Sequence, residues 1–186
     1  MTDEQMTAEV LTEEEALENS SWFKPMGEIA GFPVRPGLFN VNGATALHYG
    51  VNFTIHTHFG TSCALLLFHR DEEEPYAVLP FPEEYKIGDV YSMIVFGLDV
   101  EEFEYAYRID GPYDPVRGLL FDKRNVILDP YAKAVTGQHI WGETRPGPYH
   151  ARVVKDTFDW GDMPQSSREL SDLIIYELHV RGFTKD

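Results

Sequence analysis

The feature that most constrains this chain is an alternation of apolar and polar residues with a period of two. Residues 51–58 and 103–109 alternate in this way, and residues 63–69 and 90–96 are apolar runs of strand length. A period of two places successive side chains on opposite faces of a β-strand. Turn signals such as Asp110-Gly111-Pro112 separate the segments, and no helical period lies between them. The pattern predicts an antiparallel β-sandwich over roughly residues 40–135.

Length and charge exclude several other classes of protein. A complete (β/α)8 barrel needs about 250 residues, and this chain has 186. The 31 acidic residues outnumber the 15 Lys and Arg, so a formal net charge of −16 argues against nucleic acid and anionic membrane as partners. Apolar residues at 43% are enough to form a core.

Cysteine content and the N-terminus bear on the compartment. Cys63 is the single cysteine, which excludes an internal disulfide and a cysteine-based zinc site and fits a reducing environment. The first residues lack the basic and apolar regions of a signal peptide, and no run approaches the ~20 apolar residues of a membrane span. We therefore expect a cytoplasmic protein.

The segments that flank the alternating region differ from it. Residues 1–20 hold seven acids and no Lys or Arg, and we favour a frayed acidic tail there over a short helix starting near Thr12. Proline and glycine predict a loop over 26–40 and a linker over 142–172. Residues 173–183, rich in branched and aromatic side chains, predict a strand that needs neighbours on both sides.

Few residues suggest chemistry by type and spacing alone. His56 and His58 would share one face of a strand, but a metal site lacks its third and fourth ligands, so two exposed histidines are favoured. The aromatic residues that alternate over 103–107 suit a sugar-stacking platform or a sandwich core, and we favour the core. Phosphate-cradling and nucleophile-elbow motifs do not occur.

Longer motifs carry a resemblance to a known family. Residues 105–118 (YAYRIDGPYDPVRG) and 125–133 (NVILDPYAK) resemble a segment of the glycogen-debranching enzymes and isoamylases, a branch of the alpha-amylase superfamily, glycoside hydrolase family 13. Residues 159–162 (DWGD) and 175–184 (IYELHVRGFT) resemble the approach to that family's catalytic barrel and its first strand. Residues 36–37, 43–45 and 50–53 resemble the opening of its N-terminal β-sandwich, a family 48 carbohydrate-binding module.

The resemblance implies an all-β fold, with an immunoglobulin-like antiparallel β-sandwich of the carbohydrate-binding-module type, followed by a linker and the first strand of an incomplete (β/α)8 barrel. We expect an acidic tail over 1–28, the sandwich over 29–141, the linker over 142–172 and the barrel strand over 173–186. The chain would then be the truncated N-terminal part of a debranching enzyme. A freestanding α-glucan-binding module and a scaffold for a separate catalytic chain are the alternatives.

The family hydrolyses α-1,6 branch linkages in glycogen, starch-like glucans and limit dextrins. Its retaining mechanism uses an Asp nucleophile, a Glu acid and base, and a second Asp, all on later barrel strands. None has a matching position in this chain, and Glu177 is not one of them. The resemblance therefore implies no catalytic residue, no metal and no cofactor, no hydrolysis by these residues alone, and two partners, an α-glucan and the missing barrel.

Three residues are candidates for glycan binding through the resemblance: Tyr113, Asn125 and Tyr91. Tyr113 stands where glycogen-sensing modules have Trp, and Tyr91 where debranching enzymes usually show Trp. Ala106 replaces a Lys that would donate to sugar hydroxyls. Packing of the sandwich against the barrel is the alternative role for this surface.

Overall fold

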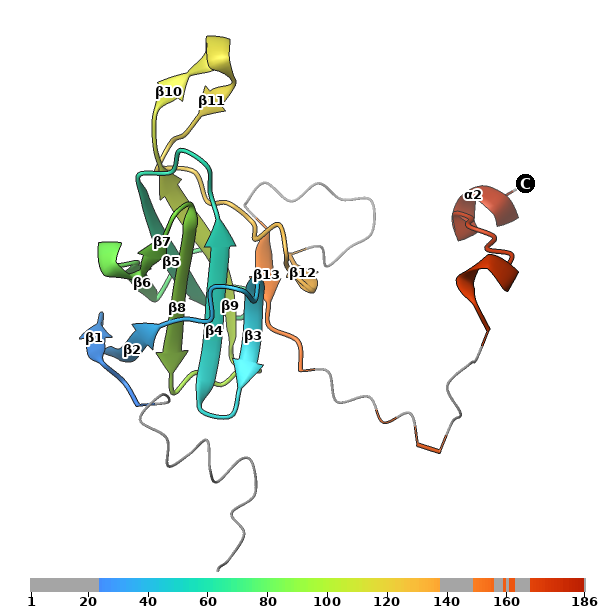
Figure 1. Cartoon of the computed structure of the whole chain (residues 1–186), viewed down its shortest axis with the longest axis horizontal. Coiled ribbons are helices and arrows are strands. Elements are labelled where there is room, and N and C mark those ends of the chain that lie inside the picture. The colour runs from blue at the N-terminus through green and yellow to red at the C-terminus, as the bar shows by residue number, and fades with distance from the viewer. Residues whose placement is uncertain (1–23, 138–148, 156–158, 160, 163–167, 186) are drawn as a thin grey trace, which may run out of the picture. The chain divides into compact units, whose positions relative to one another are not determined.

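The computed structural model describes residues 24–137, 149–155, 159, 161–162 and 168–185 (Figure 1). The acidic tail over 1–20 therefore lies outside the described residues. By contacts the chain divides into two units, residues 1–155 and 156–186. Among the described residues, no helix has the length and apolar character that crossing a membrane requires.

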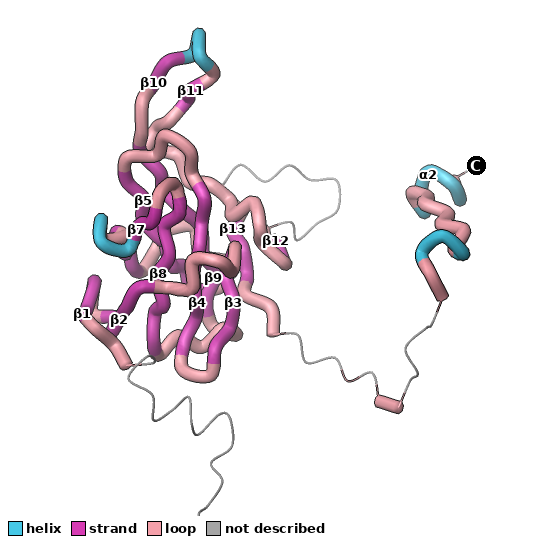
Figure 2. The backbone as a smooth tube through the Cα atoms, in the orientation of Figure 1, coloured by secondary structure: helices cyan, strands magenta, loops and turns pink. Residues whose placement is uncertain are grey.

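The first unit contains two large antiparallel sheets (Figure 2). Within the described ranges, one sheet has the order β1-β2-β8-β4-β3 with β7 beside β8, and the other has the order β12-β13-β9-β5-β6. The first consists of β1 (Gly27–Ile29), β2 (Phe32–Pro36), β3 (Gly43–Leu47), β4 (Gly50–His56), β7 (Lys86–Ile87) and β8 (Val90–Phe96). The second consists of β5 (Ser62–His69), β6 (Ala77–Pro80), β9 (Phe103–Asp110), β12 (Ala134–Thr136) and β13 (His150–Arg152).

Shorter elements complete the described structure. A separate hairpin pairs β10 (Tyr113–Asp114) with β11 (Leu119–Leu120), and its two strands are joined through a 3-10 turn at Pro115–Arg117. A second 3-10 turn, Glu83–Tyr85, precedes β7. In the second unit, a 3-10 turn at Leu170–Asp172 precedes α2 (Val180–Thr184).

The core of the sandwich lies between the two large sheets and is formed by the alternating residues. It includes Val51, Phe53 and Ile55 of β4, Leu65 and Leu67 of β5, and Phe103, Tyr105, Tyr107 and Ile109 of β9. Burial of each such side chain contributes about 1.5–3 kcal/mol. The predicted all-β sandwich is therefore confirmed, and the aromatic residues over 103–107 belong to the core.

Asn52 and Thr54, two polar residues of β4, are buried as well, which the alternation alone does not predict. The amide Oδ1 of Asn52 accepts a hydrogen bond from the Leu38 N–H at 2.7 Å, and the Thr54 and Ser92 hydroxyls lie 2.6 Å apart. Asn52, Thr54 and Ser92 are fully buried because the loop after β2 covers the outer face of this sheet. The loop satisfies polar groups that would otherwise be costly to bury.

The loop predicted over 26–40 is wrong in part. Strand β2 pairs with β8, with Val34 opposite Val95, and β1 pairs with β2 on its other side. Pro33 lies opposite Glu28 at the margin of the sheet, where three-residue β1 is the last strand of the order. Proline is tolerated in such positions because few ladder hydrogen bonds are lost there.

The linker predicted over 142–172 also contains a strand of the sandwich. Ala151 of β13 lies opposite Tyr105 of β9 and is fully buried. The His150 ring stacks on Phe68 with a centroid distance of 3.7 Å, and its Nδ1 lies 3.0 Å from the buried Glu104 carboxylate. The sandwich therefore extends beyond residue 141, because β13 returns from a distant part of the sequence.

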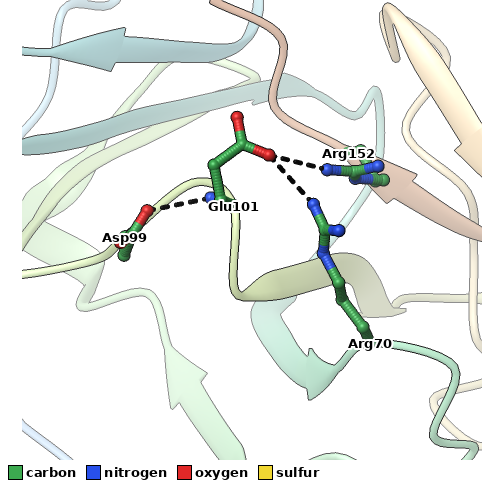
Figure 3. A network of polar contacts seen from close by, with 4 residues as sticks. All are labelled: Arg70, Asp99, Glu101 and Arg152. Carbon is green, nitrogen blue, oxygen red and sulfur yellow. Dashed lines mark hydrogen bonds and ion pairs between the residues drawn. The ribbon is translucent and has the colours of Figure 1, made fainter.

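A surface network ties β13 to the neighbouring elements (Figure 3). Glu101, in the turn before β9, accepts hydrogen bonds from Arg70 at 3.0 Å and from Arg152 at 3.3 Å. The backbone N–H of Glu101 in turn donates to the Asp99 carboxylate at 3.0 Å. The network joins the end of β5, the turn between β8 and β9, and β13.

The strand predicted over 173–183 is not observed. Residues 173–179 have no regular secondary structure, and α2 covers Val180–Thr184. The apolar side chains of this segment are exposed, and Ile174 is 100% exposed. A strand requires hydrogen-bonded neighbours, and the described residues of the second unit supply none.

Candidate functional site

The β10–β11 hairpin projects from one end of the sandwich (Figure 1). Residues at the base of this hairpin line an open cleft. It has a volume of about 460 Å3 and combines aromatic with charged side chains. The lining residues are Asp110 and Gly111 at the end of β9, Tyr113 of β10, and Phe121, Asp122, Lys123 and Arg124 after β11. The cleft is formed where the chain leaves β9, makes the hairpin and returns.

The hairpin positions Tyr113 with its side chain accessible. Tyr113 lies opposite Leu120 in the antiparallel pair and is 71% exposed. At the tip, the Asp114 carboxylate accepts a hydrogen bond from the Arg117 N–H. Gly118 then takes the left-handed conformation with φ 76°, which glycine adopts without strain. These local interactions favour the reversal of the chain and leave the Tyr113 ring at the cleft.

The base of the cleft is closely packed. A Cβ on Gly111 would lie 2.7 Å from the Phe121 ring, so only glycine allows the ring to approach the backbone this closely. Phe121 itself is partly buried against the main core. The aromatic floor of the cleft is therefore continuous with the sandwich and is rigid for that reason.

A charged pair stands on the wall of the cleft. Arg124 donates from Nε to Asp122 Oδ1 at 2.9 Å and from Nη2 to Oδ2 at 2.6 Å, in a bidentate arrangement. The hydrogen bonds from Arg124 lower the pKa of Asp122 to about 2. Asp122 is consequently a carboxylate at neutral pH, and the guanidinium, which carries five N–H donors, is held in one orientation. The pair offers acceptors and donors of the kind that orient hydroxyl groups.

The structure distributes the three predicted glycan-binding residues differently. Tyr113 lines the cleft. Asn125 is exposed immediately beyond it, and its backbone N–H donates to the Asp122 carbonyl at 3.0 Å. Asn125 is therefore adjacent to the cleft without being one of its lining residues.

Tyr91 is wrongly predicted as a glycan-binding residue. It lies opposite Ile55 in the β4–β8 pair, is 1% exposed, and packs edge-on against Phe81 with a centroid distance of 5.9 Å. Directly opposite residues share a face of the sheet, and this face is the core. Ala106 likewise is fully buried with Leu66 and Phe68.

His56 and His58 do not share one face of a strand, although the alternation predicted that they would. The β4 strand ends at His56, and His58 lies in the following loop with Nδ1 2.6 Å from the Asp89 carboxylate. This hydrogen bond lowers the pKa of Asp89. Within the described ranges, no group of three or more His, Cys, Asp or Glu side chains could hold a metal ion.

Sequence reasoning missed Phe121, Asp122 and Arg124. The available signal was a pair of opposite charges two residues apart in the short turn just before Asn125. Such a spacing is common in exposed turns and identifies a site only once the hairpin brings it next to Tyr113.

A family match and several relatives agree with this architecture. Residues 41–132, the central part of the sandwich, match carbohydrate-binding module 48, described as the isoamylase N-terminal domain. The chain corresponds in sequence to the N-terminal region of isoamylases and glycogen debranching enzymes. The resemblance found in the sequence motifs is thereby confirmed.

Two curated relatives illustrate the extent of the match. The chain is 37% identical over 155 residues to the chloroplastic isoamylase SU1 of Zea mays, covering 77% of this chain and 20% of the maize protein. It is 31% identical over 162 residues to a glycogen debranching enzyme of Serratia proteamaculans, covering 80% of this chain and 24% of that protein. The chain thus spans about a fifth of the length of the curated relatives that it matches.

Solved structures also align with the chain. Pullulanase type I from Bacillus subtilis str. 168, complexed with maltose, aligns with a TM-score of 0.46 and 20% identity, over 70% of this chain and 15% of that one. A pullulanase from Klebsiella pneumoniae, complexed with maltotriose, aligns with a TM-score of 0.46 and 18% identity, over 62% of this chain and 10% of that one.

Proposed function

We propose that this chain is the non-catalytic N-terminal region of a debranching glycoside hydrolase that acts on α-1,6 linkages of glycogen or starch-like glucans, and that its sandwich binds α-glucan at the cleft. The observation that carries the proposal is the exposed Tyr113 ring beside the Asp122–Arg124 pair. The match of residues 41–132 to a carbohydrate-binding family supports it. So do relatives named isoamylase and glycogen debranching enzyme.

The chemistry of the cleft suits a glucan. A pyranose ring presents apolar C–H groups that pack on an aromatic face, and its hydroxyls need hydrogen-bond partners of both kinds. Tyr113 supplies the aromatic face, while Asp122 accepts and Arg124 donates. A neutral polysaccharide is also compatible with a chain of net charge −16, because no like charge opposes its approach.

The proposal also assigns roles to the segments that follow the sandwich. The sandwich would be followed by a linker, and residues 173–186 would form the first strand of the catalytic barrel once neighbouring strands pair with them. The exposed side chains of Ile174, Ile175 and Leu178 support this, because an apolar segment of this composition gains stability by burial in a sheet. The buried, lone Cys63 fits a cytoplasmic location for such an enzyme.

Affinity electrophoresis in gels containing glycogen tests glucan binding directly. We expect the full chain to be retarded and Tyr113→Ala to migrate as in a gel without glycogen, while Tyr113→Phe keeps most of the retardation. Tyr76→Ala is the matched control, because Tyr76 is 40% exposed and stacks on His69, at the end of β5 opposite the cleft. Equal retardation of Tyr113→Ala and the unmodified chain would exclude the cleft as the glucan site.

A further inference from the structure

Phe59 has a backbone conformation that is unusual for a bulky residue. Its φ is 66°, and among the described residues only Ala30 and Asp71 share a positive φ without being glycine. The left-handed conformation costs an aromatic residue free energy, so such outliers persist only where the surrounding structure holds them, and they cluster at ligand-contacting sites. The Phe59 side chain is nevertheless 47% exposed. The fold therefore maintains a strained backbone and leaves an aromatic ring in solvent.

The exposed ring is fixed in position by its neighbours. The His58 ring packs on Phe59 with a centroid distance of 3.8 Å. Asp89, in the turn between β7 and β8, holds His58 through the 2.6 Å contact with Nδ1 and also accepts the Thr57 N–H at its carbonyl, at 2.8 Å. A ring anchored in this way loses little conformational entropy when a ligand packs on it.

The loop that carries Phe59 adjoins the cleft. The Thr61 N–H donates to the carbonyl of Asp110, a cleft-lining residue, at 2.8 Å. The next residue, Ser62, lies opposite Asp110 in the β5–β9 pair. In Figure 1 the loop between β4 and β5 lies at the same end of the sandwich as the base of the β10–β11 hairpin.

We infer that Phe59 is a second stacking platform for the same glucan chain, so that the site binds several consecutive sugar units and selects long chains over maltose. The inference rests on the proposed glucan binding. An exposed aromatic ring beside the His58–Asp89 pair matches the apolar face of a pyranose.

Calorimetric titration of the full chain with maltose, maltoheptaose and glycogen tests the inference. Phe59→Asn removes the ring and suits the backbone, because Asn tolerates the left-handed conformation. We expect Phe59→Asn to weaken maltoheptaose and glycogen binding about tenfold, the effect of roughly one lost stacking contact, and to leave maltose binding unchanged. Phe59→Trp should restore the affinity for the long ligands.

The outcomes separate this inference from the proposed function. If the unmodified chain binds none of the three ligands, the proposed function fails and the inference fails with it. If the chain binds and Tyr113→Ala abolishes binding while Phe59→Asn matches the unmodified chain, only the inference is overturned. An equal loss of affinity for maltose and maltoheptaose in Phe59→Asn would also overturn the inference. A second stacking platform would contribute only to the binding of the longer ligands.

Discussion

Asp129 shows how a single buried carboxylate organises the segment that follows the cleft. It is 1% exposed, accepts the Tyr105 hydroxyl at Oδ2 and the Tyr131 N–H at Oδ1, and both distances are 2.8 Å. Burial raises the pKa of Asp129 more than these hydrogen bonds lower it. Its Tyr131 neighbour lies against Gly43, where a Cβ would be 2.9 Å from the Tyr131 Cβ. The aspartate thus joins β9, β3 and the returning chain.

Asp129→Asn should change how stability depends on pH. Because the pKa of Asp129 is raised above its usual 3.8 in the folded state, its contribution to stability is present below that value and is lost as pH rises through the folded pKa. The unfolding free energy of the unmodified chain, minus that of the variant, should therefore fall as pH rises from 3.8 through the folded pKa. Urea denaturation across this range measures the difference.

Asp122→Asn provides the control of opposite sign. The pKa of Asp122 is lowered to about 2, so its contribution is present above its usual value of 3.8 and is lost as pH falls toward 2. For Asp122→Asn, the unfolding free energy of the unmodified chain minus that of the variant should rise with pH over the acid range. If this free-energy difference changed with pH in the same direction for both variants, the assigned pKa shifts of Asp129 and Asp122 would be contradicted.

Sequence motifs proposed both Tyr113 and Tyr91 for glycan binding, but Tyr113 lines the cleft and Tyr91 is buried in the core. Tyr113 follows a turn signal, which places it outside the two large sheets. Tyr91 lies within a continuous apolar run, and such runs do not distinguish a core-facing residue from a surface one. Its orientation is set by the pairing with β4, a long-range contact absent from local sequence.

At the level of elements, the loop after β2 is packed closely on the first sheet. It covers the outer face of β4 and β8, and the Gly37 N–H donates to the Ser92 carbonyl at 3.0 Å. A Cβ at residue 37 would lie 2.1 Å from the Ser92 hydroxyl and 2.6 Å from the Met93 nitrogen. Only glycine allows this approach, because backbone atoms cannot move aside as a flexible side chain can.

Gly37→Ala should destabilise the fold. The added Cβ forces the loop away from β8 and exposes the Asn52, Thr54 and Ser92 network, at a cost of about 2–4 kcal/mol in unfolding free energy. Gly27→Ala is the control, because at Gly27 the nearest atom to a new Cβ is the Tyr85 hydroxyl at 4.0 Å. Chemical denaturation measures both variants, and an equal effect of the two would contradict the close packing at residue 37.

Elements with local patterns were predictable, and elements defined by distant pairing were not. The strands near 51–56, 63–69, 90–96 and 103–110 follow alternation and apolar runs. Strand β13 lies among glycines and prolines, and only its pairing with β9 makes it a strand. Residues 173–179 show the reverse case, since strong strand-forming residues remain irregular where no neighbouring strand is paired with them.

For the molecule as a whole, the proposed glucan site lies at one end of the sandwich. The cleft, the Phe59 loop and the hairpin come from segments between residues 57 and 124 that the strand pairing brings together. The sequence motifs predicted the family, because motifs record local composition. The cleft itself requires the three-dimensional arrangement of β9, the hairpin and the following turn.

The most direct test is a two-dimensional NMR titration of the 15N-labelled chain with maltoheptaose. The account predicts that amide shifts concentrate in residues 57–61, 110–113 and 121–125. It also predicts that they persist at high salt, since the ligand is neutral. Residues 69–76, at the opposite end of β5, should be unaffected. Shifts confined to that opposite end, or no shifts at saturating ligand, would contradict the assignment of this end of the sandwich as a glucan-binding site.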